Sequence, residues 1–191
     1  MNHQRLFEGR LIRLTGPRPD DALTLARWSE DGEYRRLQDT DAPRPHPQEF
    51  FGDRDQGPEE PQNDAYEFRI RQPGDDRLLG FVAVVNIEWP NRNGWLSMGI
   101  GEEQDRRRGF GAEAAQLALR FAFDELGLHR LTLDVISDNL AALGLYRKLG
   151  FKEEGRLRER VWRDGEFNDL IYMGLLRAEW PSVLGAGPEG A

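Results

Sequence analysis

The residues best suited to chemistry lie where three arginines run into a Gly-Phe-Gly sequence, RRRGFG at positions 106–111. A helix with an apolar stripe is expected to begin there, and the first turn of a helix leaves backbone N–H groups unpaired. These donors and the positive end of the helix dipole favour an anion, and glycine leaves them open to approach. A pyrophosphate is the natural ligand. The candidate binding residues are Arg106, Arg107, Arg108, Gly109, Phe110, Gly111 and Ala112.

Two better-known phosphate motifs fit this stretch poorly. A P-loop needs Gly-Lys-Ser/Thr at the end of its glycine run, whereas this run continues with Ala-Glu, which excludes a P-loop. The dinucleotide fingerprint Gly-x-Gly-x-x-Gly/Ala is nominally matched by Gly109, Gly111 and Ala114. Its glycines should follow a hydrophobic strand directly, but the polar residues 102–108 separate them from the strand expected at 95–101. This context disfavours a nicotinamide site.

The elements that must position this loop follow from the hydrophobic periodicity. Alternating patterns predict strands, and helical spacing predicts a helix that ends at Gly127 and another that ends at Gly150. The strands are expected at 10–15, 65–72, 78–89, 95–101, 129–136, 151–162 and 170–176, and the helices at 17–31, 33–39, 110–126 and 137–150.

The sequence also predicts the helix caps and a long loop. Asp20 is predicted to cap the first helix, and Ser137, Asp138 or Asn139 is predicted to cap the last one. The acidic, proline-rich stretch 41–64 predicts a loop, either a solvated surface excursion or part of a substrate lid.

The order of elements predicts an α/β (α+β) fold, in which a mixed, mostly antiparallel sheet is flanked by helices. A chain of 191 residues is expected to form a single domain. We place that domain at residues 1–180 and a flexible tail at 181–191.

The composition excludes several classes of function. Net charge −8 argues against non-specific nucleic-acid binding. The absence of cysteine excludes disulfides, zinc–thiolate sites and a cysteine nucleophile. The histidines His3, His46 and His129 lack metal-ligand spacing, so no metal is expected. No apolar run of roughly 18 residues and no signal segment is present, so we expect no membrane contact and a cytoplasmic protein.

Several linked motifs resemble one family. RRRGFG is similar to the Arg/Gln-x-x-Gly-x-Gly/Ala motif of the GNAT superfamily of N-acetyltransferases, which binds the coenzyme A pyrophosphate. The segment from 126 to 176 resembles the ribosomal-protein-alanine and spermidine acetyltransferase branch, with Asn139, Tyr146, a following LGF and Asp169 in matching order. The resemblance extends from about Ala65 to Leu176 and implies acetyl-CoA as cosubstrate.

The resemblance implies roles for residues outside the glycine loop. Backbone N–H groups among Met98, Gly99 and Ile100 would polarise the thioester carbonyl. Asn139 would hydrogen-bond the pantetheine arm. Tyr146 would hydrogen-bond or protonate the departing thiolate, since a thiol has a pKa of roughly 8.5 and tyrosine one of roughly 10.

The general base is left open by the sequence. An alkyl ammonium has a pKa of roughly 10.4, so the acceptor must lose a proton directly or through water. Glu88, Asp134 and Asp169 are the candidate carboxylates, and a chain of waters is the alternative. Trp28 or Trp89 could form a wall of the acceptor site.

The predicted reaction is direct attack by a primary amine in a ternary complex. A protein N-terminus, a polyamine or another small amine remains open as acceptor, and a homodimer is possible. The alternative from another class is a non-catalytic acyl-CoA-binding module or sensor on the same fold.

Overall fold

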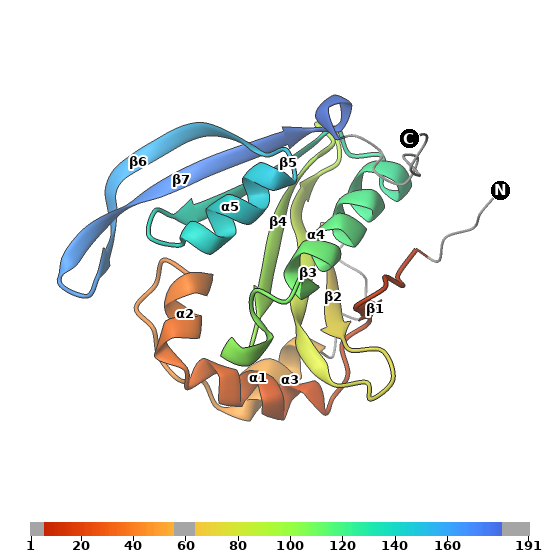
Figure 1. Cartoon of the computed structure of the whole chain (residues 1–191), viewed down its shortest axis with the longest axis vertical. Coiled ribbons are helices and arrows are strands. Elements are labelled where there is room, and N and C mark those ends of the chain that lie inside the picture. Colours follow the sequence, from red (N-terminus) through yellow and green to blue (C-terminus); the bar gives the residue numbers. More distant parts are fainter. Residues whose placement is uncertain (1–5, 56–63, 181–191) are drawn as a thin grey trace, which may run out of the picture.

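A single sheet of seven strands organises the computed structural model, which describes residues 6–55 and 64–180 (Figure 1). The strand order is β1-β2-β3-β4-β5-β7-β6, and every neighbouring pair is antiparallel except β4 and β5. The expected mixed, mostly antiparallel sheet is confirmed. The strands are β1 Arg13–Thr15, β2 Tyr66–Arg71, β3 Leu78–Glu88, β4 Asn93–Ile100, β5 Arg130–Ile136, β6 Lys152–Arg163 and β7 Glu166–Leu176.

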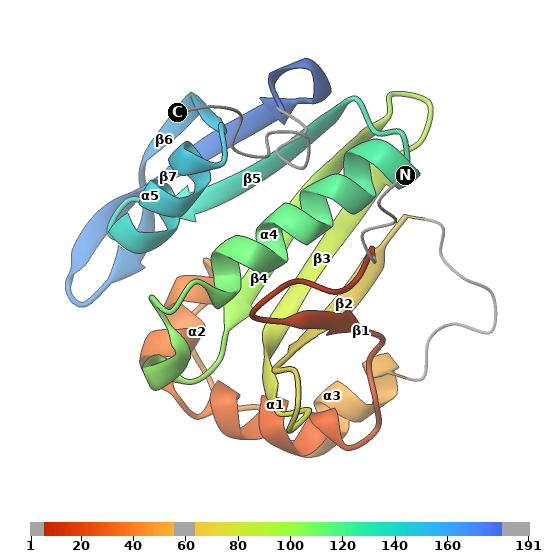
Figure 2. The same cartoon turned by 45° about the vertical axis from the view of Figure 1, so that its right-hand side comes forward.

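The helices lie at three places on the sheet. In Figure 2, α4 runs along β3 and β4, α5 lies beside β5 and β7, and α1, α2 and α3 gather at one end of the sheet. Their bounds are α1 Asp21–Ser29, α2 Gly32–Gln38, α3 Gln48–Asp55, α4 Phe110–Arg120 and α5 Leu140–Lys148. The predicted helix 110–126 is thus α-helical only to Arg120 and continues as a π-turn, Phe121–Glu125.

The helix α3 corrects the prediction of a loop over 41–64. The prolines at 43, 45 and 47 precede this helix instead of interrupting it. His46 is held by hydrogen bonds with Ser29, and its ring stacks 4.0 Å from that of Phe50. Phe51 packs against the buried cluster around Trp28. This aromatic anchoring stabilises a helix that composition alone does not predict; residues 56–63 lie outside the described part.

The strand β1 is shorter than the predicted strand 10–15. The backbone N–H groups of residues 10–12 donate to the carboxylate of Glu113 in α4, at 2.6–2.9 Å, instead of joining a ladder. The helix caps also differ in part from expectation, because the side chain of Asp20 makes no capping hydrogen bond. At the other helix, Asn139 is confirmed as the cap.

The sheet opens between β4 and β5. Their parallel pairing covers only Asn93–Trp95 against Arg130–Thr132. Further along, β4 pairs only with β3, and β5 pairs only with β7. The two strands therefore separate towards Ile100 and Ile136, and a gap opens in the middle of the sheet.

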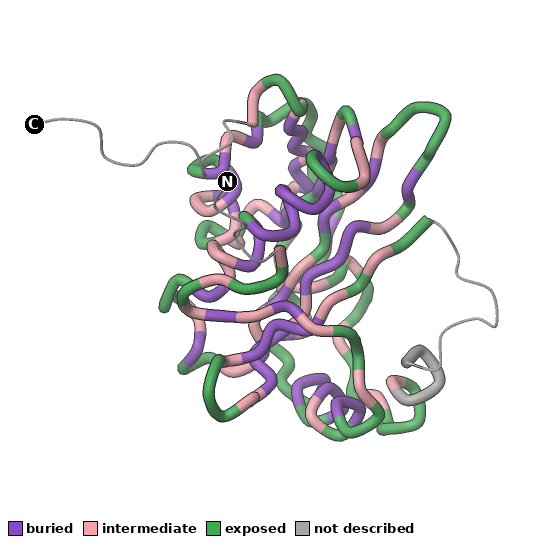
Figure 3. The backbone as a smooth tube through the Cα atoms, turned by 90° about the vertical axis from the view of Figure 1, so that its right-hand side faces the viewer, coloured by how far each residue is buried: buried purple, intermediate pink, exposed green. Residues whose placement is uncertain are grey.

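The main core lies between the sheet and the helices α4 and α5. Figure 3 shows buried segments running through the middle of the molecule. The buried face of α4 carries Ala114, Ala115 and Ala118, whose small side chains let the helix lie close to the sheet. Within residues 6–55 and 64–180, no helix is long and apolar enough to cross a membrane.

Candidate active site

The amino end of α4 faces the gap. Its cap, Gly109, has φ 89°, a left-handed conformation that favours glycine. The first bond inside the helix runs from Glu113 N to Gly109 O at 3.0 Å. The N–H groups of the first turn, at Phe110, Gly111 and Ala112, therefore remain free for a ligand. A Cβ on Gly111 would lie 3.2 Å from Met98 Cε, so the bare glycine keeps the helix end close to β4.

Arg106 anchors the glycine–arginine loop, residues 106–111, to neighbouring elements. Its Nη2 donates to Gly101 O at 2.9 Å, and its guanidinium lies within ion-pair distance of Asp31 at 3.3 Å and Glu33 at 3.6 Å. It also lies 5.9 Å from the ring centre of Tyr34. Arg106 thus ties the loop to β4 and α2.

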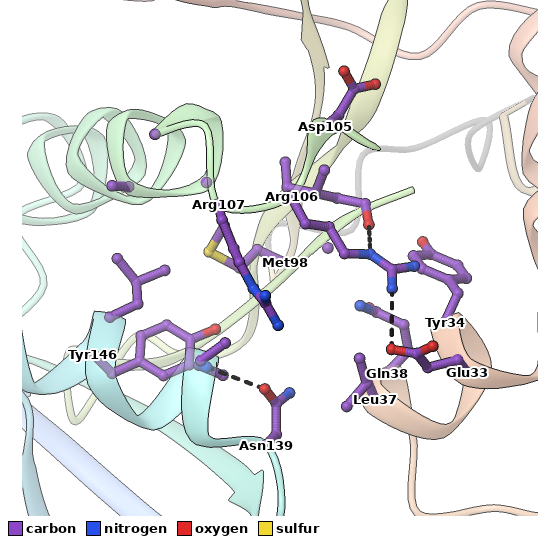
Figure 4. A pocket seen from close by; sticks show the side chains of 18 residues that line it. Glu33, Tyr34, Leu37, Gln38, Met98, Asp105, Arg106, Arg107, Asn139 and Tyr146 are labelled. Atoms are coloured by element: carbon purple, nitrogen blue, oxygen red, sulfur yellow. Dashed lines mark hydrogen bonds and ion pairs between the residues drawn. The ribbon is translucent and has the colours of Figure 1, made fainter. Parts of the chain in front are cut away.

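The other two arginines differ from each other. Arg108 lies 3.3 Å from the buried Asp105 and 5.0 Å from the ring centre of Phe110. Arg77, with hydrogen bonds of 2.5 and 3.0 Å, lowers the pKa of Asp105 and keeps it ionised. Arg107 forms no hydrogen bond or ion pair with another described side chain and points into the cavity (Figure 4). Arg107 is therefore the arginine available to an anion.

A first cavity of about 330 Å³ connects this helix end with α5. Asn139 accepts a hydrogen bond from Ala142 N at 3.1 Å, which leaves its NH₂ group for a ligand. Tyr146 lies two turns further along α5, and its ring meets Phe151 edge-on at 5.7 Å. Ala141, Ala142 and Leu145 line the same wall.

Tyr146 stays neutral at every physiological pH. Its side chain is 7% exposed, and burial raises its pKa well above the ordinary value, with the charge of Asp134 acting in the same direction. A tyrosine of this kind donates a hydrogen bond readily. Complete transfer of its proton to a thiolate is less favourable, because the thiol is the stronger acid.

The strand β4 offers backbone donors to the gap. Gly101 N donates to Leu79 O at 2.9 Å, and antiparallel ladders alternate in direction. The amides of Met98 and Ile100 therefore point away from β3 and into the gap, whereas that of Gly99 points towards β3. Of the three predicted donors, Met98 and Ile100 have the suitable direction.

A second cavity of about 270 Å³ meets the first at Tyr146. Asp134, Asp39 and Asn86 line it, together with Gln38, Met98 and Asn139 from the shared wall. Desolvation raises the pKa of Asp134, and the charge of Asp39 adds to the shift. A carboxylate with a raised pKa is a stronger base than an ordinary aspartate.

The remaining sequence candidates lie elsewhere. Glu88 is exposed, accepts a hydrogen bond from Asn91 at 2.9 Å, and lines neither cavity. Asp169 accepts from Glu159 N at 2.9 Å and from Arg156 at 3.0 Å, and both bonds lower its pKa and weaken it as a base. Trp28 is buried against Tyr34 and donates to Glu102, so it does not line the second cavity.

Trp89, the other expected wall residue, is exposed and also lines neither cavity. The structure adds three residues that sequence reasoning missed: Gln38, Asp39 and Asn86. Asn86 has φ 50° at an irregularity of β3. No sequence pattern predicts that Asn86 lines the second cavity. No group of three or more potential metal ligands occurs in the described part of the chain.

The splayed parallel pair, the free helix end and the two cavities that meet at Tyr146 together form one candidate site. A family model described as acetyltransferase (GNAT) domain matches residues 11–152, so the chain belongs to the GNAT acetyltransferase family.

Individual proteins show the same similarity. Spermidine N(1)-acetyltransferase of Vibrio cholerae is 31% identical over 103 residues, 54% of this chain and 59% of the relative. YdaF of Bacillus subtilis, provisionally named a ribosomal N-acetyltransferase, is 29% identical over 106 residues, 56% of this chain and 57% of the relative. Both relatives are thus matched over less than two thirds of their length.

Solved structures show the same fold. Spermidine N-acetyltransferase from Vibrio cholerae, solved in complex with CoA and spermine, has a TM-score of 0.78 at 21% identity and covers 90% of this chain and 98% of that chain. A structure of the Vibrio cholerae enzyme described as dodecameric has a TM-score of 0.71 at 22% identity and covers 89% and 96%.

Proposed function

We propose that the protein transfers the acetyl group of acetyl-CoA to an amine. One observation carries the proposal. The gap between β4 and β5 has the amino end of α4, with its unpaired N–H groups, on one side, and on the other a cavity lined by Asp134, whose pKa is raised. Tyr146 stands where the two sides meet. Family membership and the fold of the CoA-bound Vibrio enzyme support this assignment.

The first cavity suits the cosubstrate. The free N–H groups of the α4 first turn and Arg107 would bind the pyrophosphate. Ala141, Ala142 and Leu145 would pack along the pantetheine arm, and the NH₂ of Asn139 would donate to one of its carbonyls. The amides of Met98 and Ile100 would then face the thioester oxygen.

The reaction needs one bond formed and one broken. The amine nitrogen attacks the thioester carbon, and the negative charge on the oxygen is stabilised by the β4 amides. As the C–S bond breaks, Tyr146 donates a hydrogen bond to the thiolate. The proton lost by the amine passes to Asp134, directly or through water.

The acceptor that we propose first is a cationic amine. Asp39 and Asp134 line the second cavity, and no lysine or arginine of the described chain does. This charge attracts an ammonium group and repels an acceptor with a nearby carboxylate. A polyamine such as spermidine fits this chemistry; a protein N-terminus is the second candidate, supported by the naming of YdaF.

Self-association is a further part of the proposal. The strand β6 is an edge strand exposed along most of its length, and Leu157, Trp162 and Phe167 on the β6–β7 hairpin are exposed apolar side chains. We propose a homodimer or a larger assembly, which sedimentation of the protein measures directly. A monomer at all concentrations contradicts this part.

Release of the CoA thiol tests the central proposal. The protein should release thiol from acetyl-CoA only when an amine is present, and spermidine should be a better acceptor than glycine because it lacks a carboxylate. A protein that binds acetyl-CoA but releases no thiol with any amine is instead an acyl-CoA-binding module.

A further inference from the structure

Gln38, the last residue of α2, stands where three cavities meet. It lines the first and second cavities and also a third, of about 320 Å³, between α1, α2, α3 and the sheet. Among the described residues, it is the one common to all three linings. Figure 4 shows it across the first cavity from Tyr146. A side chain at this junction faces both substrates of a ternary complex.

The side chain of Gln38 packs against β4 at Gly99, which has no side chain of its own. A Cβ built on Gly99 would lie 2.4 Å from Nε2 of Gln38 and 2.8 Å from its Oε1. Gly99 stands between Met98 and Ile100, the residues whose amides face the gap. The missing side chain of Gly99 thus leaves the carboxamide of Gln38 the space beside the strand that would hold the thioester.

The carboxamide of Gln38 is unused by the protein itself. It forms no hydrogen bond with another residue of the described chain. A glutamine carboxamide offers two N–H donors and one oxygen acceptor. Polar groups partly withdrawn from water are costly when they stay unpaired, so a substrate that pairs with the carboxamide gains affinity.

The end of α2 is held firmly by the β6–β7 turn. Arg163 is buried, and its Nη2 donates to the carbonyl oxygens of Asp39 and Asp41, both at 2.8 Å. Arg36 pairs with Asp164 at 2.8 Å. These contacts fix the backbone on both sides of Gln38, so the end of α2 from which its side chain extends is in position before a substrate arrives.

We infer that Gln38 binds the acceptor amine: its Oε1 accepts a hydrogen bond from an amine N–H and turns the nitrogen lone pair towards the thioester carbon. The inference rests on the proposed function and adds the residue that orients the acceptor. Gln38 forms no covalent bond and carries no proton in the reaction. Its effect is therefore on the encounter of amine and thioester, not on binding of the cosubstrate.

Steady-state kinetics of Gln38→Ala test this role. Loss of one such hydrogen bond should lower kcat/KM for the amine by about tenfold. The Kd for acetyl-CoA should stay within about twofold of wild type, because the pyrophosphate contacts are untouched. Gln104→Ala removes an exposed glutamine that lies outside the three cavities and should leave both constants unchanged. Gln38→Leu, which preserves volume, replaces the alanine variant if that variant does not fold.

Gly99 supplies an independent test of the same space. Gly99→Ala should displace the carboxamide and lower kcat/KM by a similar factor. In the double variant with Gln38→Ala and Gly99→Ala, the new Cβ at position 99 meets no carboxamide. Its kcat/KM for the amine should therefore equal that of Gln38→Ala alone. Losses that simply add would contradict the shared space.

The possible failures are distinguishable. An active wild type with unchanged kcat/KM in Gln38→Ala overturns this inference and leaves the proposed function standing. A loss confined to acetyl-CoA affinity also overturns it, because Gln38 would then belong to the cosubstrate wall. If the wild type acetylates no amine, the proposed function and this inference fail together.

Discussion

Arg107 is expected to hold the pyrophosphate, and Arg107→Ala measures its share. Its guanidinium points into the first cavity and has no partner among the described side chains. A hydrogen bond to a charged group contributes about 1.5–3 kcal/mol. Arg107 is exposed, so solvent screening places its share at the lower end. Since about 1.4 kcal/mol is a factor of ten in affinity, the Kd for desulfo-CoA should rise by about tenfold.

Isothermal titration calorimetry with desulfo-CoA measures this Kd without turnover. Arg108→Ala is the matched control, because its guanidinium is engaged by Asp105 at 3.3 Å; it should change the Kd by less than about threefold. Added salt should narrow the difference between wild type and Arg107→Ala. An unchanged Kd in Arg107→Ala, together with a large rise in Arg108→Ala, would refute the assignment.

Three further substitutions test the two proposed catalytic residues and the contact that joins residues 10–12 to α4. Asp134→Asn should lower kcat by about 10²–10⁴-fold. In the wild type, kcat/KM should decrease at low pH as Asp134 becomes protonated, and this contribution to the pH profile should be absent from the variant. The pKa of Asp134 is higher in the folded protein than in the unfolded chain, so its ionisation makes the folded state less stable as pH rises between these two pKa values. At neutral pH, thermal unfolding should therefore show Asp134→Asn to be at least as stable as wild type. Tyr146→Phe should lower kcat by roughly tenfold, the value of one hydrogen bond, and leave the Kd for acetyl-CoA unchanged; an equal kcat removes Tyr146 from the reaction. Glu113→Ala leaves three backbone N–H groups without their acceptor and should cost roughly 1–3 kcal/mol in chemical denaturation; exposed Glu125→Ala should cost nothing measurable.

Most of the fold could be predicted because its signals are local. Alternation marks the strands, and Gly127 and Gly150 have positive φ where the two helices were expected to end. Asp164 and Gly165, which also have positive φ, form the turn after the strand expected at 151–162. The helix α3 escaped prediction because it depends on the hydrogen bonds between His46 and Ser29 and on the packing of Phe51 against the cluster around Trp28, which join segments separated in the chain.

The site was predictable only as far as its motif reached. The sequence treats Arg106, Arg107 and Arg108 alike, and only their tertiary partners separate the free one from the two engaged ones. Glu88 and Asp134 likewise differ through topology: β5 runs along the gap, whereas Glu88 ends β3 beside a hairpin turn. Gln38 reaches the site through the docking of α2, which no sequence pattern records.

Thermal unfolding with acetyl-CoA and with NADP in parallel tests most directly whether the glycine–arginine loop serves coenzyme A. A ligand at 100 times its Kd stabilises the folded state by about 2.7 kcal/mol. For a chain of this length that raises the midpoint by about 5 to 10 °C. We predict this shift with acetyl-CoA and none with NADP. A shift with NADP alone would contradict the assignment of the loop, and the proposed acetyl transfer would fail with it.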